Sequence, residues 1–179
     1  MDKSEKLIII GPSGSGKDFL VRNLVKKGLI PCIKWTTRPM RSGEKEGINY
    51  KYVDNTFFEK SIKEGIFITY QSFDINTSNK KWYYGITKES FNSSQIFIMT
   101  PKEYESLNLS KNDRKGLFVV YLDIDRKIRE SRLHVRDDHN DSINRRLDSD
   151  EIDFINFNDY DLKITDPEFS AENVYELMD

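Results

Sequence analysis

The stretch LIIIGPSGSGKDFLVRNL, residues 7–24, decides the fold of this chain. Its first residues, 7–10, form an uninterrupted apolar run, which is typical of a strand buried in a parallel sheet. Leu20 and Leu24 then follow at helical spacing, and Gly28 supplies a helix stop shortly afterwards. A strand, a glycine-rich turn and a helix in this order indicate an α/β fold.

The turn itself fits the P-loop pattern except at its last position. Its glycines allow backbone N–H groups to converge on phosphate oxygens, and Lys17 would reach the β- and γ-phosphates of a nucleoside triphosphate. Asp18 stands where the pattern has Ser or Thr, and a carboxylate is also a hard oxygen ligand. We therefore predict bound ATP and Mg²⁺, with Asp18 as the metal ligand. The predicted ATP-binding residues are Gly11, Pro12, Ser13, Gly14, Ser15, Gly16, Lys17 and Asp18.

Composition limits the class of protein. The chain has 179 residues, of which 37% are hydrophobic, and this suffices for one domain with its own core. Charged residues make up 32% with a formal net charge of -2, which argues against a general nucleic-acid binder. The single cysteine, Cys32, gives no disulfide framework, and the N-terminal residues predict neither a signal peptide nor a membrane span. We expect a cytoplasmic protein without a nucleic-acid or membrane partner, as a monomer or homodimer.

Beyond the first helix, strands and helices alternate, which predicts a parallel sheet with helices on both faces. Thr56 with Glu59 resembles a capping box, Asp125 is expected to cap a helix, and 134–141 is expected to be a loop. The segment 36–87 interrupts the alternation and is predicted to be an inserted subdomain. Strands are expected at 30–35, 66–73, 82–86, 96–99, 117–124 and 162–165, and helices at 57–64, at 101–107, and around Ile128, Ile143 and Val174.

The segment TTRPMRSGEKEGINY, residues 36–50, is the second informative stretch, and together with the P-loop it resembles the guanylate kinase family. Tyr83-Tyr84-Gly85 is similar to that family's Tyr-Gly element, and RLHVR at 132–136 with SINRRL at 142–147 is similar to its arginine-bearing lid. The resemblance implies a single domain over 1–179, of the P-loop kinase type. Its core would comprise 1–35 and 88–179, its acceptor-binding subdomain about 36–87, and its lid about 134–146.

The resemblance also implies the roles of individual side chains in phosphoryl transfer to a small phosphorylated acceptor. The acceptor phosphate would be held by guanidinium and phenol groups, with Glu44 orienting the arginines. Three lid arginines would stabilise the charge on the transferring group, so no protein nucleophile is needed. The implied acceptor-binding residues are Lys34, Arg38, Arg41, Glu44, Tyr50, Thr69 and Tyr84, and the implied catalytic residues are Lys17, Arg38, Arg132, Arg136 and Arg146.

The chain departs from the family where the family reads guanine. Lys34 stands in place of a Ser, Thr69 in place of a Glu, and Ile86 in place of a Ser or Thr. The Asp-x-Asp at the end of the next core strand is replaced by Met99-Thr100-Pro101. A site that hydrogen-bonds the polar edge of a base distinguishes one base from another through its own polar groups. The loss of these groups argues against strict specificity for guanine. The resemblance favours GMP or dGMP as acceptor, with altered base specificity.

Two other functions fit the same residues. Ribose 1,5-bisphosphate kinases look similar at Gly16-Lys17-Asp18 and at Lys34-Trp35, and there Lys34 would meet a second phosphate. The guanylate-kinase-like domains of scaffold proteins instead bind phosphopeptides without catalysis, but they have lost the P-loop. The intact Lys17 and the lid arginines therefore favour an enzyme, a guanylate kinase-like phosphotransferase.

Overall fold

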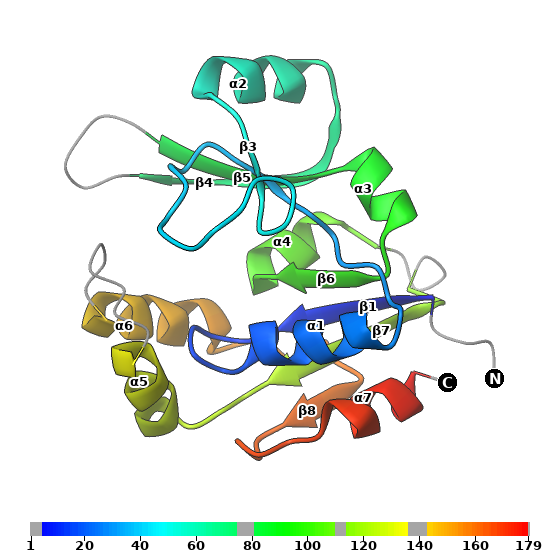
Figure 1. Cartoon of the computed structure of the whole chain (residues 1–179), viewed down its shortest axis with the longest axis vertical. Helices are drawn as coiled ribbons and strands as arrows, with labels where there is room; N and C mark the ends of the chain where they lie inside the picture. Colours follow the sequence, from blue (N-terminus) through cyan, green and yellow to red (C-terminus); the bar gives the residue numbers. More distant parts are fainter. Residues whose placement is uncertain (1–4, 75–80, 110–113, 136–142, 179) are drawn as a thin grey trace. The chain divides into compact units, whose positions relative to one another are not determined.

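A computed structural model describes residues 5–74, 81–109, 114–135 and 143–178 (Figure 1). The contacts within the chain divide it into two compact units. The first unit comprises Met1–Pro31 and Gln95–Asp179, and the second is Cys32–Ser94. The predicted acceptor-binding subdomain, 36–87, lies within the second unit. None of the helices in the described ranges is long and apolar enough to cross a membrane.

The first unit contains a parallel sheet whose strands lie in the order β6-β1-β7-β8. Leu7 through Ile10 of the central strand are fully buried, because a strand pairs on either side of them and helices cover both faces. This confirms the parallel sheet predicted from the apolar run. The strands are β1 (Lys6–Ile10), β6 (Ile96–Met99), β7 (Leu117–Leu122) and β8 (Leu162–Ile164).

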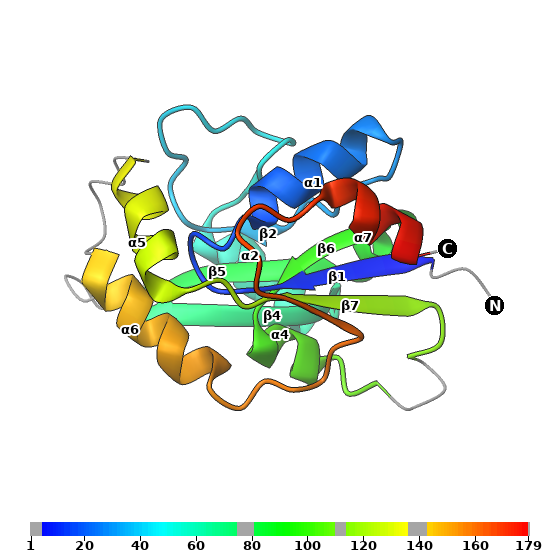
Figure 2. The same cartoon turned by 90° about the horizontal axis from the view of Figure 1, so that it is seen from below.

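Helices cover the two faces of this sheet (Figure 2). On one face, Leu20 and Leu24 of α1 pack with Val174 of α7 against Leu7 and Ile9. On the other face, aromatic rings gather around Tyr121, with α4 and α6 beside them; the rings are Phe154, Phe157 and Tyr160. The helices of this unit are α1 (Lys17–Lys26), α4 (Pro101–Ser106), α5 (Arg126–Val135), α6 (Ile143–Phe154) and α7 (Ala171–Leu177).

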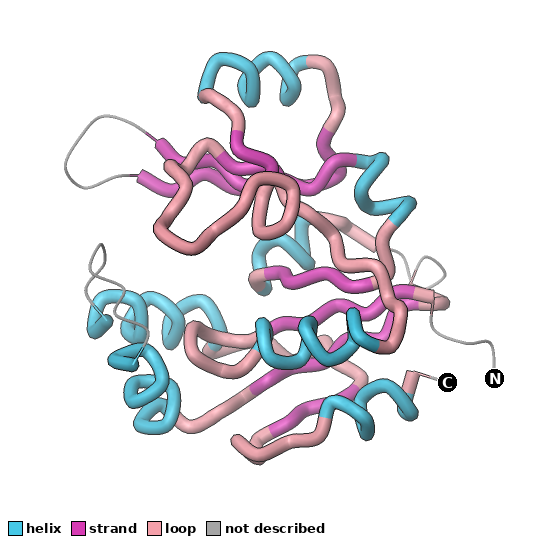
Figure 3. The backbone as a smooth tube through the Cα atoms, in the orientation of Figure 1, coloured by secondary structure: helices cyan, strands magenta, loops and turns pink. Residues whose placement is uncertain are grey.

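The second unit is built on a mixed sheet, whose strands are magenta in Figure 3. The strands lie in the order β3-β2-β5-β4. Phe58 stacks on Phe67 at 4.3 Å and on Tyr83 at 5.2 Å between ring centroids, which forms the core of the unit. A Cβ on Gly85 would lie 2.6 Å from Phe67 and 2.9 Å from Phe58, so this position accepts only glycine without a rearrangement. The elements are β2 (Trp35–Thr36), β3 (Lys51–Tyr52), α2 (Asn55–Lys63), β4 (Phe67–Asp74), β5 (Lys81–Thr87) and α3 (Lys88–Ser93).

Strand register decides which side chains share the sheet face opposite to α2. Tyr84 is paired with Thr36 on one side and Gln71 on the other, and Ile86 is paired with Thr69. Because side chains alternate along a strand, these residues all share one face, whereas Gly85 faces the rings of Phe58 on α2 and Phe67 on β4. Thr69 and Ile86 are two of the positions at which the sequence departs from the pattern of the guanylate kinase family. Both are therefore neighbours of Tyr84.

Some predicted element boundaries are wrong. The strand expected at 30–35 is reduced to β2, because Pro31 has no N–H for a ladder and makes only an isolated bridge to Ile96. The capping box at Thr56 is also wrong: Asp54 caps α2, and its Oδ1 accepts the N–H of Phe57 at 2.7 Å.

Two further differences concern helices. The sequence did not predict α3, whose N-cap Thr87 accepts a hydrogen bond from the Ser90 N–H at 3.0 Å. In the predicted loop 134–141, His134 and Val135 complete α5, and the rest of that loop lies outside the described residues. The predicted cap is confirmed, because Asp125 Oδ1 accepts the N–H of Lys127 at 2.8 Å.

Candidate active site

The P-loop connects β1 to α1, and its glycines make a tight turn possible. Gly14 and Gly16 have φ values of 77° and 104°, in the left-handed region that side chains disfavour. A Cβ on Gly14 would lie 2.7 Å from the carbonyl oxygen of Arg129, so the loop contacts the backbone of α5 directly. Ser15 Oγ is buried, and it has no hydrogen-bond partner among the described residues.

Lys17 is the first residue of α1, and its ammonium lies against the loop. Its Nζ donates to the carbonyl oxygens of Gly11 at 2.6 Å and Pro12 at 2.8 Å. The eight residues predicted to bind ATP are contiguous in this turn and the start of the helix. The backbone N–H groups of these residues, Pro12 excepted, and the positive end of α1 make the turn suited to a polyanion.

Asp18 follows in the first turn of α1 and is exposed. Within the described ranges, no three or more His, Cys, Asp or Glu side chains gather into a possible metal site. Mg²⁺ commonly takes one or two carboxylates and completes its shell with phosphate oxygens and water. A single carboxylate beside a phosphate-binding loop fits that coordination, and Asp18 is the residue that would supply it.

The arginines assigned to the lid differ in their surroundings. Arg132 of α5 donates to the carbonyl oxygens of Gly14 at 3.3 Å and Pro167 at 2.8 Å, so its guanidinium lies against the P-loop. Arg146 is half-buried on α6, one helical turn before Asp150. Arg136 lies outside the described residues.

Arg129 also contacts the P-loop, and sequence reasoning missed it. Its side chain is buried on α5, with only 5% of the residue exposed. Nε donates to the carbonyl oxygen of Ile124 at 2.9 Å, and Nη1 lies 3.5 Å from the carbonyl oxygen of Ser13. The available signal was the spacing from Leu133, which places Arg129 on the apolar side of the helix.

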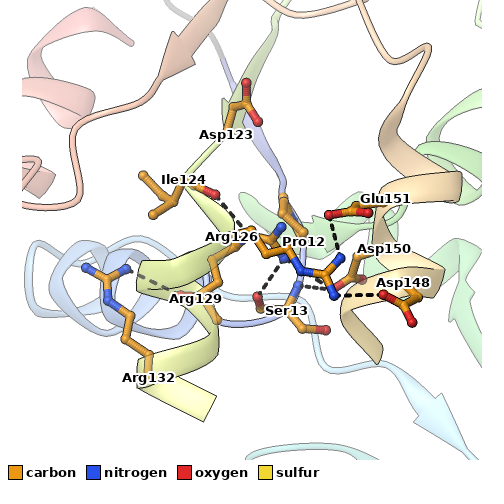
Figure 4. Close-up of polar contacts among 12 residues, drawn as sticks. Pro12, Ser13, Asp123, Ile124, Arg126, Arg129, Arg132, Asp148, Asp150 and Glu151 are labelled. Carbon is orange, nitrogen blue, oxygen red and sulfur yellow. Dashed lines mark hydrogen bonds and ion pairs between the residues drawn. The ribbon is translucent and has the colours of Figure 1, made fainter. Parts of the chain in front are cut away.

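Asp150 of α6 reaches the same part of the loop (Figure 4). Its Oδ2 accepts the backbone N–H of Ser13 at 2.8 Å and lies 3.7 Å from Nη1 of Arg129. Beside it, Arg126 pairs with Asp148 at 2.7 Å and with Glu151 at 2.6 Å. These ion pairs join α5 to α6.

In the second unit, Arg38 is held in place by its own neighbours. Nη2 donates to Glu44 Oε1 at 2.7 Å and Nη1 to the Pro39 carbonyl oxygen at 2.7 Å, and the residue is 5% exposed. The guanidinium also lies 5.5 Å from the ring centroid of Tyr50. Burial opposes the positive charge, but the hydrogen bonds to Glu44 and Tyr84 outweigh it and raise the pKa of Arg38.

Glu44 connects the segment that carries both arginines. Its Oε2 accepts the backbone N–H of Arg41 at 2.7 Å and the phenol O–H of Tyr52 at 2.7 Å. Burial alone would raise the pKa of Glu44, but these hydrogen bonds and that from Arg38 lower it to about 2. Glu44 is therefore an anion throughout the neutral range.

Aromatic rings line the cluster. Tyr50 contacts Tyr84 at 5.8 Å and Tyr52 at 5.9 Å between ring centroids, each edge to face. Burial raises the pKa of Tyr84 against the opposing charge of Arg38, and burial with Glu44 raises that of Tyr52 to about 12. Sequence reasoning missed Tyr52, although its alternation with Tyr50 already placed both side chains on one face.

The structure brings part of the predicted acceptor set together. Arg38, Glu44, Tyr50 and Tyr84 form one cluster, to which Arg41 contributes its backbone N–H. Thr69 is buried on the same sheet face as Tyr84, and Lys34 is half-buried just before β2. The P-loop belongs to the first unit and this cluster to the second.

Comparisons with known proteins agree in one family. The family model described as guanylate kinase matches residues 3–174. The guanylate kinase of Rickettsia felis is 30% identical over an alignment of 187 residues, which covers 98% of this chain and 94% of that protein. That of Mycoplasma genitalium is 32% identical over 171 residues, covering 90% and 69%.

A shorter match is closer in sequence. The guanylate kinase of Coxiella burnetii is 46% identical over 70 residues, but this match spans only 34% of that protein. Among solved structures, the guanylate kinase from Anaplasma phagocytophilum has a TM-score of 0.69 at 18% identity, covering 99% of this chain and 86% of that one. This structural likeness concerns the fold.

Proposed function

The chain belongs to the guanylate kinase family of nucleotide kinases, and we propose that it transfers the γ-phosphoryl group of ATP to the phosphate of a nucleoside monophosphate. GMP is the first candidate for the acceptor, because the family relatives are named guanylate kinases, and dGMP carries the same base. The observation that carries the proposal is the buried Arg38, whose guanidinium is held by Glu44 beside Tyr50 and Tyr84. Such a group is suited to bind the phosphate of the acceptor.

The donor side of the reaction is assigned to the first unit. Lys17 and the backbone N–H groups of Gly11 and of residues 13–18 would hold the triphosphate, and Asp18 would hold Mg²⁺. The metal would neutralise charge on the phosphates when it is bound. Arg132, Arg136 and Arg146 would add positive charge around the transferring group, so catalysis rests on positioning and electrostatics.

Base specificity is the finer part of the proposal. Around Tyr84, the sheet face presents Thr69 and Ile86, and Ile86 has no hydrogen-bonding group on its side chain. A guanine edge would therefore meet fewer polar partners than the family provides, and we propose that this kinase accepts other or modified bases as well.

One observation favours a second candidate, a ribose 1,5-bisphosphate kinase. Lys34 precedes the short strand β2, whose Thr36 is paired with Tyr84. A cation at that position would suit a second phosphate on the acceptor better than it suits an uncharged base. The same P-loop and the same Arg38 would serve this reaction.

A cytoplasmic location goes with the proposal, because ATP and nucleoside monophosphates are available there and the sequence has a single cysteine, Cys32, and therefore no disulfide framework. We propose a small-molecule acceptor as the partner, and either a monomer or a homodimer as the assembly.

An acceptor screen tests the proposal. Purified protein with ATP and Mg²⁺ is given GMP, dGMP, AMP, CMP, UMP, dTMP or ribose 1,5-bisphosphate, and ADP release is followed. Release that requires a nucleoside monophosphate supports the first function, and release with ribose 1,5-bisphosphate alone supports the second. No release with any acceptor would overturn both and favour a non-catalytic binding module.

A further inference from the structure

We propose that the Ser13 N–H and the Arg129 guanidinium form a binding site for one phosphate oxygen of the nucleotide, and that the Asp150 carboxylate occupies this site until the nucleotide displaces it. The inference rests on the proposed function, because it requires that the P-loop bind a nucleoside triphosphate. It assigns roles to Arg129 and Asp150, neither of which the P-loop pattern includes.

The position of one carboxylate oxygen between a backbone N–H and a guanidinium carries the inference. Asp150 Oδ2 accepts the Ser13 N–H at 2.8 Å, and the same oxygen lies 3.7 Å from Arg129 Nη1 (Figure 4). A backbone N–H of a P-loop and a guanidinium are both among the donors that hold phosphate oxygens in proteins. The carboxylate oxygen therefore has the surroundings that a phosphate oxygen would have.

The site is fixed before any ligand arrives. Arg129 is 5% exposed, and its Nε is bound to the Ile124 carbonyl oxygen at 2.9 Å, so the guanidinium has little freedom to turn. The loop is fixed as well, because a Cβ on Gly14 would lie only 2.7 Å from the Arg129 carbonyl oxygen. Donors held in this way do not need to be reorganised when an anion binds.

Asp150 can leave without moving its helix. The ion pairs of Arg126 with Asp148 and Glu151 keep α6 on α5 independently of Asp150. The side chain of Asp150 is 17% exposed, so a change of rotamer brings its carboxylate toward water. Two anions cannot share the Ser13 N–H, and the carboxylate therefore competes with the nucleotide for it.

The direction of the change in nucleotide affinity distinguishes competition by Asp150 from a structural role of this residue. Asp150→Ala should bind the non-hydrolysable analogue AMPPNP with Mg²⁺ about tenfold more tightly than the natural protein, by calorimetry, because the competing carboxylate is gone. Asp150→Asn, which keeps the size but loses the charge, should show a smaller gain. Asp148→Asn is the matched control: it removes a charge from the same helix but leaves Ser13 untouched, and its affinity should stay within about twofold.

The contrary outcomes are distinct. Equal or weaker AMPPNP binding by Asp150→Ala, relative to Asp148→Asn, would overturn the inference while the phosphoryl transfer of the natural protein still supports the proposed function. Absence of AMPPNP binding by the natural protein would overturn both. Far-UV circular dichroism checks that each variant is folded, and if Asp150→Ala unfolds, the comparison rests on Asp150→Asn. The double variant Arg129→Leu/Asp150→Ala should not show the increased AMPPNP affinity of Asp150→Ala, because the guanidinium that recognises the phosphate is then missing.

Discussion

The phenol of Tyr52 donates a hydrogen bond to Glu44 Oε2 at 2.7 Å, while the other oxygen of the same carboxylate accepts from Arg38. Tyr52 therefore positions Arg38 indirectly, through a residue that contacts both. The chain from phenol to carboxylate to guanidinium lies entirely within the second unit.

Tyr52→Phe should weaken acceptor binding rather than ATP binding. The variant loses a hydrogen bond to a charged group, which typically contributes about 1.5–3 kcal/mol, and Glu44 becomes free to turn. We expect the KM for the acceptor to rise by about three- to tenfold with the KM for ATP unchanged, in steady-state assays with each substrate varied. Tyr70→Phe is the control, since Tyr70 is on β4 and packs on Phe67. Equal changes in both KM values would contradict the assignment.

The low pKa of Glu44 predicts how stability depends on pH. Its pKa of about 2 lies below the ordinary value of 4.5, so the anion stabilises the folded state at neutral pH. This stabilisation is present above pH 4.5 and is lost as the pH falls toward 2. Urea unfolding should therefore show the natural protein losing about 1–2 kcal/mol more than Glu44→Gln between pH 6 and pH 3, allowing for solvent screening. Parallel pH curves for the two proteins would refute this.

Lys17→Ala should abolish phosphoryl transfer while leaving the fold intact. The ammonium of Lys17 binds the carbonyl oxygens of Gly11 and Pro12 in the loop and is expected to move to the phosphates. Loss of such a charge costs a factor of about 10² or more in kcat. The measurement is ADP release with the preferred acceptor, and Lys26→Ala, in the last turn of α1, is the control. Turnover that persists in Lys17→Ala would show that another group contacts the γ-phosphate.

Gly14→Ala should damage nucleotide binding beyond the cost of its backbone conformation. A Cβ there meets the Arg129 carbonyl oxygen at 2.7 Å, and φ is 77°. Gly28→Ala is the control, because Gly28 has φ 95° and no atom within 4 Å of its Cβ position. Thermal unfolding should show a loss of about 1 kcal/mol for Gly28→Ala and about 2–3 kcal/mol for Gly14→Ala. Only Gly14→Ala should also weaken AMPPNP binding, and equal effects of the two variants would count against a steric role for this contact.

The fold was largely predictable from local patterns. The run at 7–10, the turn after it and the alternation of later elements specify a parallel sheet, because burial on both faces demands continuous apolar strands. The predictions that failed depend on local backbone chemistry. Pro31 interrupts the strand that was expected at 30–35, and Asp54 caps α2 in place of Thr56. Where a strand or helix begins depends on contacts with residues elsewhere in the fold, which the sequence pattern does not show.

Site residues that belong to a sequence motif could be predicted. Residues that come together only through the packing of helices could not. Lys17, Arg38 and Glu44 were found from motifs. Arg129 and Asp150 are 21 positions apart in the sequence and meet only because α5 and α6 pack together at the P-loop. From the sequence alone, an arginine on a helix is expected to be a solvated surface charge. Only the structure shows the carbonyl oxygens that the buried Arg129 contacts.

The pairing of Arg38 with Pro39 and Glu44 changes when the entropy of this side chain is lost. A free arginine gives up about 2 kcal/mol of rotamer entropy when it is immobilised. In this protein most of that loss occurs as the second unit folds, and the arriving acceptor meets a guanidinium that is already ordered. Acceptor binding should accordingly be favourable in enthalpy, with only a small opposing entropy from the protein.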